Sequence, residues 1–245
     1  MPSVTGTATH DEAAAVAVGS AAWWHAWQER LTRRRPRADG LTVERIVEAA
    51  VSLVDAEGLD ALTVRRLAEH FTTGSASLYR HFASREELLE LLVDHVIGDV
   101  RLPPGGLGAR QRVEWLSGEL RRVLMEHANL VPVLATSPLL GPNAVRGAEN
   151  GLAALLDAGY EAEAAVLAYR ALIDYVLGTV FFDTSRAGRG DEADDRRGLV
   201  ASLRDDAFPT LRAHEAVIAT VSSDAVFRFG LRAFLDGMQQ RFLSR

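Results

Sequence analysis

The sequence lacks two reactive residue types altogether. None of its 245 residues is cysteine, which excludes disulfides, thiolate metal sites and a cysteine nucleophile and is compatible with the reducing cytosol. None is lysine, so all 27 basic residues are arginine. This second absence excludes the lysine of a phosphate-binding loop, Schiff-base chemistry and lysine general bases.

Long apolar runs and export signals are also absent. The most apolar run, 172–182, has 11 residues and contains Asp174, whereas a helix that spans a membrane needs about 20 apolar residues. The first 18 residues have no basic start and contain Asp11 and Glu12, unlike a secretory signal peptide. We therefore expect a soluble, cytoplasmic protein that does not contact a membrane.

The charges are unevenly distributed along the chain. The formal net charge is −6, yet residues 30–85 contain ten arginines against seven acids, whereas residues 86–245 contain 17 arginines against 23 acids. A basic segment inside an acidic chain predicts that this segment meets a polyanion. The clustered arginines form either a solvated linker or an arm that lies along nucleic-acid phosphates or enters a minor groove. They are Arg30, Arg33, Arg34, Arg35 and Arg37.

Helical spacing of apolar residues dominates the rest of the sequence. No sustained two-residue alternation or hairpin turn is found, so we predict an all-α fold. The breaker at 103–106 separates a small front part from a larger helical bundle. We expect a solvated loop over 186–197, where no apolar period is found. Helical patterns behind the breaker cover 109–127, 129–136, 142–158, 161–184, 210–220 and 223–242.

The front part has the organisation of a helix-turn-helix. Thr42 caps a supporting helix that ends at Gly58, and Thr63 caps a first short helix. A break at 72–74 leads into a second short segment over 75–82. In this motif the second short helix lies in the major groove with its N-terminal residues at base edges. The residues that we expect to face bases or the sugar-phosphate backbone from this helix are Ser75, Ala76, Ser77, Tyr79, Arg80 and His81.

A family resemblance strengthens this interpretation. Residues 62–82, together with the capped helix start at 84–89, resemble the DNA-binding domain of the tetracycline-repressor-like family of bacterial transcription regulators. The resemblance covers roughly 42–98. It implies that Arg65 contacts a guanine edge and that Arg85 stands where the family usually has a phosphate-binding lysine. It also implies phosphate contacts by Thr63, Tyr79 and His81, and base contacts by Ser75, Ala76 and Ser77.

The chain departs from the family pattern at the turn. Thr72 occupies a position where the family usually has glycine, because the backbone needs a positive φ there. A threonine that keeps this geometry costs about 1–2 kcal/mol. We therefore expect either a strained turn or a slightly re-aimed recognition helix.

The back half resembles the branch of the family with the tetracycline-repressor type of C-terminal domain. The resemblance rests on 127–134, 138–144 and 227–238. It implies a homodimer in which the last helix and the long helix near 161–184 pack against their copies, which suits a reader of two half-sites. The alternative for the apolar stripe of the last helix is intramolecular core. The interface residues that we predict are Leu167, Tyr175, Phe227, Leu231, Phe234, Leu235 and Met238.

The same resemblance implies a small-molecule effector inside the C-terminal bundle. Plain core packing is the alternative for every candidate lining residue, and Asp174 either pairs with Arg170 or faces a ligand amine. The tetracycline repressor binds its magnesium-drug chelate through a histidine and a glutamate, near whose places this chain has Leu134 and Phe182. We therefore predict an apolar or aromatic effector and no metal or other cofactor. The candidate lining comprises Trp115, Leu116, Leu120, Leu134, Leu139, Asp174, Tyr175, Thr179, Phe181 and Phe182.

The first 30 residues lie outside the resemblance. We expect a helix over 13–31 with Trp23, Trp24 and Trp27 along one side. Three tryptophans so close together either dock on the body or a partner, or belong to a segment that folds only on binding. Together these observations divide the chain into an N-terminal extension (1–38), a DNA-binding domain (39–100) and a ligand-binding and dimerisation domain (101–245).

Two other classes of function compete with a ligand-responsive regulator. An enzyme is disfavoured because the sequence has no Gly-x-Ser-x-Gly elbow, no phosphate loop with lysine and no His-Glu-x-x-His zinc helix. The second rival is a helical ligand-binding or scaffold protein without sequence-specific DNA binding, which Thr72 and the acidic total charge leave open. We predict a regulator that a small molecule releases from a near-palindromic DNA operator, and repression is the commoner outcome in the family that it resembles.

Overall fold

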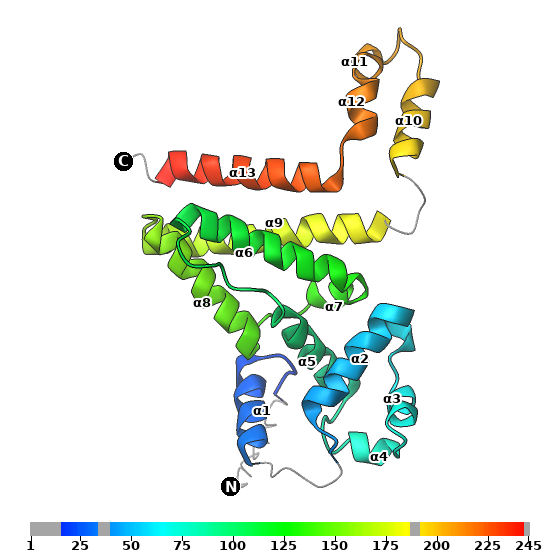
Figure 1. Cartoon of the computed structure of the whole chain (residues 1–245), viewed down its shortest axis with the longest axis vertical. Helices are drawn as coiled ribbons and strands as arrows, with labels where there is room; N and C mark the ends of the chain where they lie inside the picture. Colours follow the sequence, from blue (N-terminus) through cyan, green and yellow to red (C-terminus); the bar gives the residue numbers. More distant parts are fainter. Residues whose placement is uncertain (1–15, 34–39, 187–191, 243–245) are drawn as a thin grey trace, which may run out of the picture.

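The computed structural model describes residues 16–33, 40–186 and 192–242, and within these ranges every regular element is a helix. Figure 1 shows a small group of helices at one end, α2 to α4, which α5 joins to a larger layered body. The all-α prediction is therefore confirmed.

Side-chain caps set the helix boundaries of the front part. The Thr42 hydroxyl accepts a hydrogen bond from the Arg45 amide at the start of α2 (Val43–Glu57), and Gly58 ends that helix with φ 85°. Thr63 caps α3 (Val64–His70) in the same way. The next helix, α4 (Ser75–Leu78), is shorter than the predicted 75–82 because the chain turns after Leu78. Ser84 caps α5 (Arg85–Ile97) through the Glu87 amide, and the Glu87 carboxylate in turn accepts the amide of Ala83.

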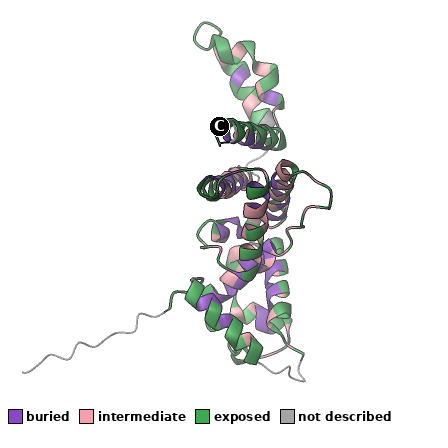
Figure 2. Ribbon diagram, turned by 90° about the vertical axis from the view of Figure 1, so that its left-hand side faces the viewer, coloured by how far each residue is buried: buried purple, intermediate pink, exposed green. Residues whose placement is uncertain are grey.

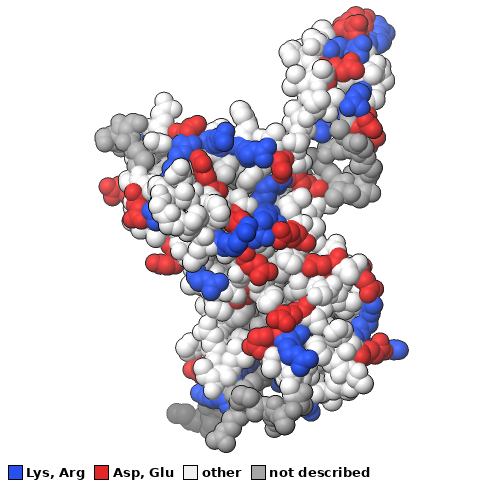
Figure 3. Space-filling model, viewed as in Figure 1, with Lys and Arg blue, Asp and Glu red and all other residues white. Residues whose placement is uncertain are grey.

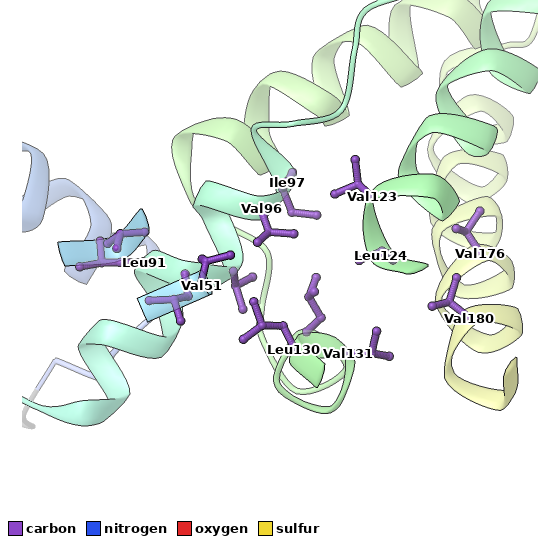
Figure 4. Packing of buried hydrophobic residues seen from close by; sticks show 14 of the residues in the cluster. Val51, Leu91, Val96, Ile97, Val123, Leu124, Leu130, Val131, Val176 and Val180 are labelled. Atoms are coloured by element: carbon purple, nitrogen blue, oxygen red, sulfur yellow. The ribbon is translucent and has the colours of Figure 1, made fainter. Parts of the chain in front are cut away.

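The body is built from α6 (Ala109–Glu126), α7 (Val131–Leu134), α8 (Pro142–Asp157), α9 (Ala162–Arg186) and α13 (Ser223–Phe242). Helices α6, α8 and α9 pack on one another, and α5 packs on α2, α6 and α8. Figure 4 shows the result: buried residues run without a break from Val51 and Leu91 through Leu130 to Val176 and Val180. One hydrophobic core therefore extends from the DNA-binding end into the bundle.

Three helices project from the far end of the body, namely α10 (Glu192–Ser202), α11 (Pro209–Ala213) and α12 (Glu215–Thr220). The prediction of a loop over 186–197 is wrong from Glu192 onward. Although α10 lacks apolar periodicity, it packs along α12, buries Val200, and is fixed where Arg196 donates to the Val221 carbonyl (3.2 Å). Tertiary packing thus overrides weak local propensity. Figure 2 shows that this projection is largely exposed.

The N-terminal extension docks on the body through helix α1 (Ala21–Arg33). The described part of the extension is not helical before Ala21, because residues 18–20 form a turn in which Gly19 has φ 80°. Trp23, Trp24 and Trp27 are 3–5% exposed and join the main core. Docking of these tryptophans on the body, one of the two alternatives, is therefore confirmed.

The stripe on α13 proves to be intramolecular core. Phe227, Leu231, Leu235 and Met238 are buried within one chain, where α13 packs on α9. Their burial favours the intramolecular-core alternative for this stripe, because a chain that already buries these side chains leaves little of them for a copy to contact. A different set of large apolar side chains is exposed on these two helices: Val166, Leu167, Phe181, Phe182, Val226, Phe229 and Phe242.

Helix α9 also explains the apolar character of this region. By length and composition alone, Ala162–Ser185 could cross a membrane. Its buried residues, including Leu172, Val176 and Val180, instead pack in the core between α6, α7, α8 and α13. Other large apolar residues of α9 are exposed on the single chain, where a second protein surface would cover them: Val166, Leu167, Phe181 and Phe182.

Candidate nucleic-acid interface and ligand cavity

The helix-turn-helix residues are presented at one end of the molecule. Leu67, Leu78 and Phe82 are buried and attach α3 and α4 to the core. The opposite sides of the same helices leave Ser75 and Ala76 exposed. Small side chains at the start of α4 let its backbone approach a partner closely, which suits insertion between the walls of a DNA groove.

Arg65 extends from α3 on the same side. Its side chain is 87% exposed and pairs with Glu69 one turn later, Nε to Oε1 at 2.9 Å. The Thr63 hydroxyl accepts the Arg66 amide and is exposed. Exposed ion pairs are weak, so Arg65 can leave Glu69 for a base edge at little cost.

The residues after α4 flank this surface. Tyr79 is 52% exposed, with its ring 6.1 Å from that of Phe82. Arg80 donates to the Ser77 hydroxyl at 2.7 Å, which places the two side chains together. His81 is half-buried. Arg85 donates to the carbonyls of Leu59 and Leu62 at 3.2 and 3.4 Å, so its guanidinium fixes the short connection between α2 and α3 to the start of α5.

The structure describes only part of the arginine-rich segment. Arg30 points into the body and donates to Glu87 at 3.3 Å, so it belongs to the docking of α1 and not to an arm. Arg33 ends α1, is exposed and pairs with Glu29. Arg34 and Arg35 lie outside the described residues.

The turn keeps the geometry that the motif needs. Thr72 has φ 50°, and the amides of Thr72 and Thr73 donate to carbonyls of α3 at 3.1 and 2.9 Å. A β-branched residue in this region of φ is strained. Of the two alternatives, the strained turn is the one that the structure shows.

A cavity of about 110 Å³ lies in the bundle between α5, α6, α8 and α9. Four of the predicted residues line it, namely Leu116, Leu120, Leu134 and Leu139. Four polar residues of the lining were not predicted from the sequence, namely Ser117, Asn143, Arg146 and Tyr169. The close approach of Tyr169 to Gly151 explains the glycine: a Cβ there would lie 2.8 Å from the Tyr169 ring.

The other predicted lining residues lie elsewhere. The Trp115 indole donates to the Arg101 carbonyl (3.2 Å), and Thr179 donates to the Val176 carbonyl of its own helix (2.9 Å). Asp174 pairs with Arg170 at 3.3 Å, which confirms the ion-pair alternative. The remaining three are Tyr175, which stacks on Phe227 and Phe234 of α13, and Phe181 and Phe182, both exposed.

Three acidic side chains on one face of α5 connect the DNA-binding end with the cavity. Glu87 accepts hydrogen bonds from the Trp23 indole (2.9 Å) and the Ala83 amide (2.8 Å). Glu90 accepts one from the Ser137 hydroxyl at 3.0 Å. Asp94 accepts from the first amides of α8, those of Asn143 and Ala144, at 3.0 and 3.1 Å.

Burial governs how two of these acids titrate. Burial raises the pKa of Asp94, against the opposing effect of the Asn143 and Ala144 amides and of the Arg146 charge. Burial also raises the pKa of Glu90. An acid inside the apolar run 88–97 is the sequence signal that could have drawn attention to Asp94.

The loop between α7 and α8 is strained beside the cavity. Leu139, which lines the cavity, has φ 53°, and its amide donates to the Ser137 hydroxyl (3.2 Å) that in turn contacts Glu90. Non-glycine residues with positive φ often occur at ligand-binding and switching segments. The cavity wall and α5 are therefore joined through a loop that stores strain.

Comparison with known proteins decides the family. The model of "Bacterial regulatory proteins, tetR family" matches residues 46–92, and "Tetracyclin repressor-like, C-terminal domain" matches residues 103–242. The chain belongs to the TetR family. An HTH-type transcriptional regulator of Saccharopolyspora erythraea is 37% identical over 177 residues, which cover 72% of this chain and 73% of that protein.

Further TetR-family relatives agree over most of the chain. The HTH-type transcriptional repressor DrrR1 of Streptomyces coeruleorubidus is 34% identical over 225 residues, which cover 85% of this chain and 82% of that protein. The solved structure of ActR from Streptomyces coelicolor in complex with actinorhodin is 35% identical, with a TM-score of 0.75, and covers 83% of this chain and 97% of that chain.

These findings establish the general function. The chain is a DNA-binding transcriptional regulator of the TetR family. Regulators of this family are soluble, and the family is not an enzymatic one.

Proposed function

We propose that this TetR-family regulator is a cytoplasmic repressor that binds a near-palindromic operator with α3 and α4 in the major groove. The observation on which the proposal rests is that Ser75, Ala76 and Arg65 are exposed on one side of a motif whose other side is buried. We assign the contact with a guanine edge to Arg65 and the other base contacts to Ser75, Ala76 and Ser77. The proposed backbone contacts are those of Thr63, Tyr79, Arg80, His81 and Arg85, with Arg33, Arg34 and Arg35 as an additional arm.

The proposed division of labour follows the chain. The extension (1–38) docks through its helix α1 beside the DNA-binding domain (39–100), and residues 101–245 bind the effector and the second subunit. The exposed apolar residues of α9 and α13, such as Leu167 and Phe229, form the proposed subunit interface. Two subunits then place two recognition helices about one helical turn of DNA apart, or somewhat more.

We propose an aromatic effector that binds in the cavity without a metal. The cavity lining is almost entirely apolar, which favours a ligand of that character. ActR, which is 35% identical, has been solved with actinorhodin and with (S)-DNPA bound. A ligand that displaces Leu139 or the start of α8 moves Glu90 and Asp94, and α5 transmits this movement to α3 and α4.

Selection of bound DNA from a random pool tests the DNA-binding proposal. We expect the purified dimer to select a two-fold symmetric sequence and to retard it in a gel in a salt-dependent manner. Arg65→Ala should lose about 1–3 kcal/mol of discrimination at one base pair of each half-site. Tyr79→Phe is the matched comparison, because the loss of a phosphate contact weakens binding to all sequences alike. Unchanged base preference in Arg65→Ala would show that the assigned docking is wrong.

A further inference from the structure

The cavity has one charged residue among its described lining residues. Of the side chains that line it, Ser117, Asn143 and Tyr169 are polar and neutral, Arg146 is charged, and the remainder are apolar or glycine. Arg146 lies in the second turn of α8 and is exposed. Its guanidinium is therefore accessible from solvent at the mouth of an apolar cavity.

Arg146 also differs from its neighbours in having no ion-pair partner. Within 101–170, a range that the structure describes throughout, every other arginine lies within 4.0 Å of a carboxylate. Figure 3 shows how closely arginine and acidic side chains alternate over this part of the surface. The charge of Arg146 is thus available to an incoming anion without displacing a carboxylate.

Asp94 interacts with Arg146 through its charge but forms no ion pair with it. Asp94 is 6% exposed, and one of its oxygens accepts the Asn143 and Ala144 amides. Burial is the main influence on the pKa of Asp94 and raises it, whereas Arg146 acts on it only through its charge. An anion bound to Arg146 would therefore lie near the contact between α5 and α8.

A second polar group faces the cavity from the adjoining helix. Tyr169 of α9 lines the cavity, is half-buried, and donates no hydrogen bond within the described part of the chain. Burial raises the pKa of its phenol, so the group stays neutral and can donate. Arg146 on α8 and Tyr169 on α9 thus provide a cationic and a neutral donor in one cavity.

From these observations we infer that the cavity selects an aromatic ligand with an anionic group, either a carboxylate or an ionised phenol. The ring lies among the apolar residues and the anion binds Arg146, with Tyr169 as a further donor. The volume of the cavity is similar to that of an engineered protein cavity that holds one benzene ring. A larger ligand therefore extends out of the cavity past Arg146, which lies at its mouth. This inference rests on the proposed effector function and specifies the ligand class.

A matched pair of probes tests the inference on the intact dimer. Calorimetry would compare 2-naphthoate with 2-naphthalenemethanol, which differ mainly in the negative charge. We expect the wild type to bind the acid about ten-fold more tightly than the alcohol, since a hydrogen bond to a charged partner has an effect of this size. Arg146→Gln should abolish this preference by weakening only the acid, and Tyr169→Phe should reduce it.

Two controls make the outcome decisive. Arg170→Gln removes an arginine that pairs with Asp174 outside the cavity, and it should leave the preference unchanged. Arg146→Met is a second variant in case the glutamine variant does not fold. Equal binding of both probes, or an unchanged preference in both Arg146 variants, would overturn the inference, as would failure of the acid to bind. Operator binding, measured in parallel, should be the same in every variant and in the wild type. A wild type that binds no operator DNA would refute the proposed function independently of how the two probes bind.

Discussion

Replacement of Glu87 by alanine should destabilise the protein and release its N-terminal helix. Glu87 is 6% exposed; one carboxylate oxygen accepts from the Trp23 indole and Arg30, and the other from the Ala83 amide. Alanine would leave the buried Trp23 N–H without a partner, which costs about 1–3 kcal/mol, and would remove the acceptor of the Ala83 amide just before α5, which costs about 1 kcal/mol. We expect a loss of about 2–4 kcal/mol in the free energy of unfolding.

Urea unfolding followed by two signals checks this expectation. Far-ultraviolet circular dichroism reports the helices as a whole, whereas tryptophan emission reports three buried indoles of α1 among the four tryptophans of the chain. The emission of Glu87→Ala should shift to the red at lower urea than the wild type. Glu86→Gln, on the exposed side of the same turn, is the control and should cost less than about 1 kcal/mol. A Glu87→Ala protein within about 0.5 kcal/mol of wild type, with unchanged emission, would refute the reasoning.

Four further predictions follow from strain, charge and coupling. Thr72→Gly should raise the free energy of unfolding by about 1 kcal/mol, because relief of a positive φ exceeds the entropic cost of glycine; a lower melting temperature would contradict this. Two arginines lower the pKa of Glu119 from 4.5 to about 2, so the stability that its ion pairs give the folded protein is complete above pH 4.5 and is lost as the pH falls toward 2. Between pH 4.5 and 2, the free energy of unfolding of Glu119→Gln should therefore fall by about 1–2 kcal/mol less than that of the wild type, as measured by urea unfolding at each pH. Arg121→Met should cost about 3 kcal/mol in urea unfolding, because it removes the buried partner of the half-buried Asp183. Asp94→Ala should bind a releasing ligand yet stay on operator DNA, and normal release in a gel-retardation assay would exclude the coupling through α5.

Local chemistry made the front half predictable. Thr42, Thr63 and Ser84 each cap the helix that was expected of them, and Gly58 ends α2 with positive φ. Caps act within a few residues of sequence, so a single sequence contains the information. Thr72 stood out because its position in the motif requires a conformation that threonine disfavours.

Features that depend on distant contacts were not predictable in the same way. The periodicity of α13 showed an apolar stripe correctly, yet periodicity does not say whether the stripe faces its own chain or a copy, and Phe227 and Leu231 prove to face their own. Helix α10 depends on α12 for its burial. Arg146 and Tyr169 were missed because their significance lies in the absence of partners, which only three-dimensional neighbours reveal.

The close approach of Gly151 to Tyr169 has a consequence for how this regulator could diversify. A single methyl group at position 151 would press against the edge of the phenol ring, which lines the cavity, so the ring would have to shift and the shape of the cavity would change. Such a change alters the shape of the sensor while the residues at the opposite end of the molecule stay untouched. A descendant of this chain could thus respond to a new chemical signal through one codon and still control the same genes.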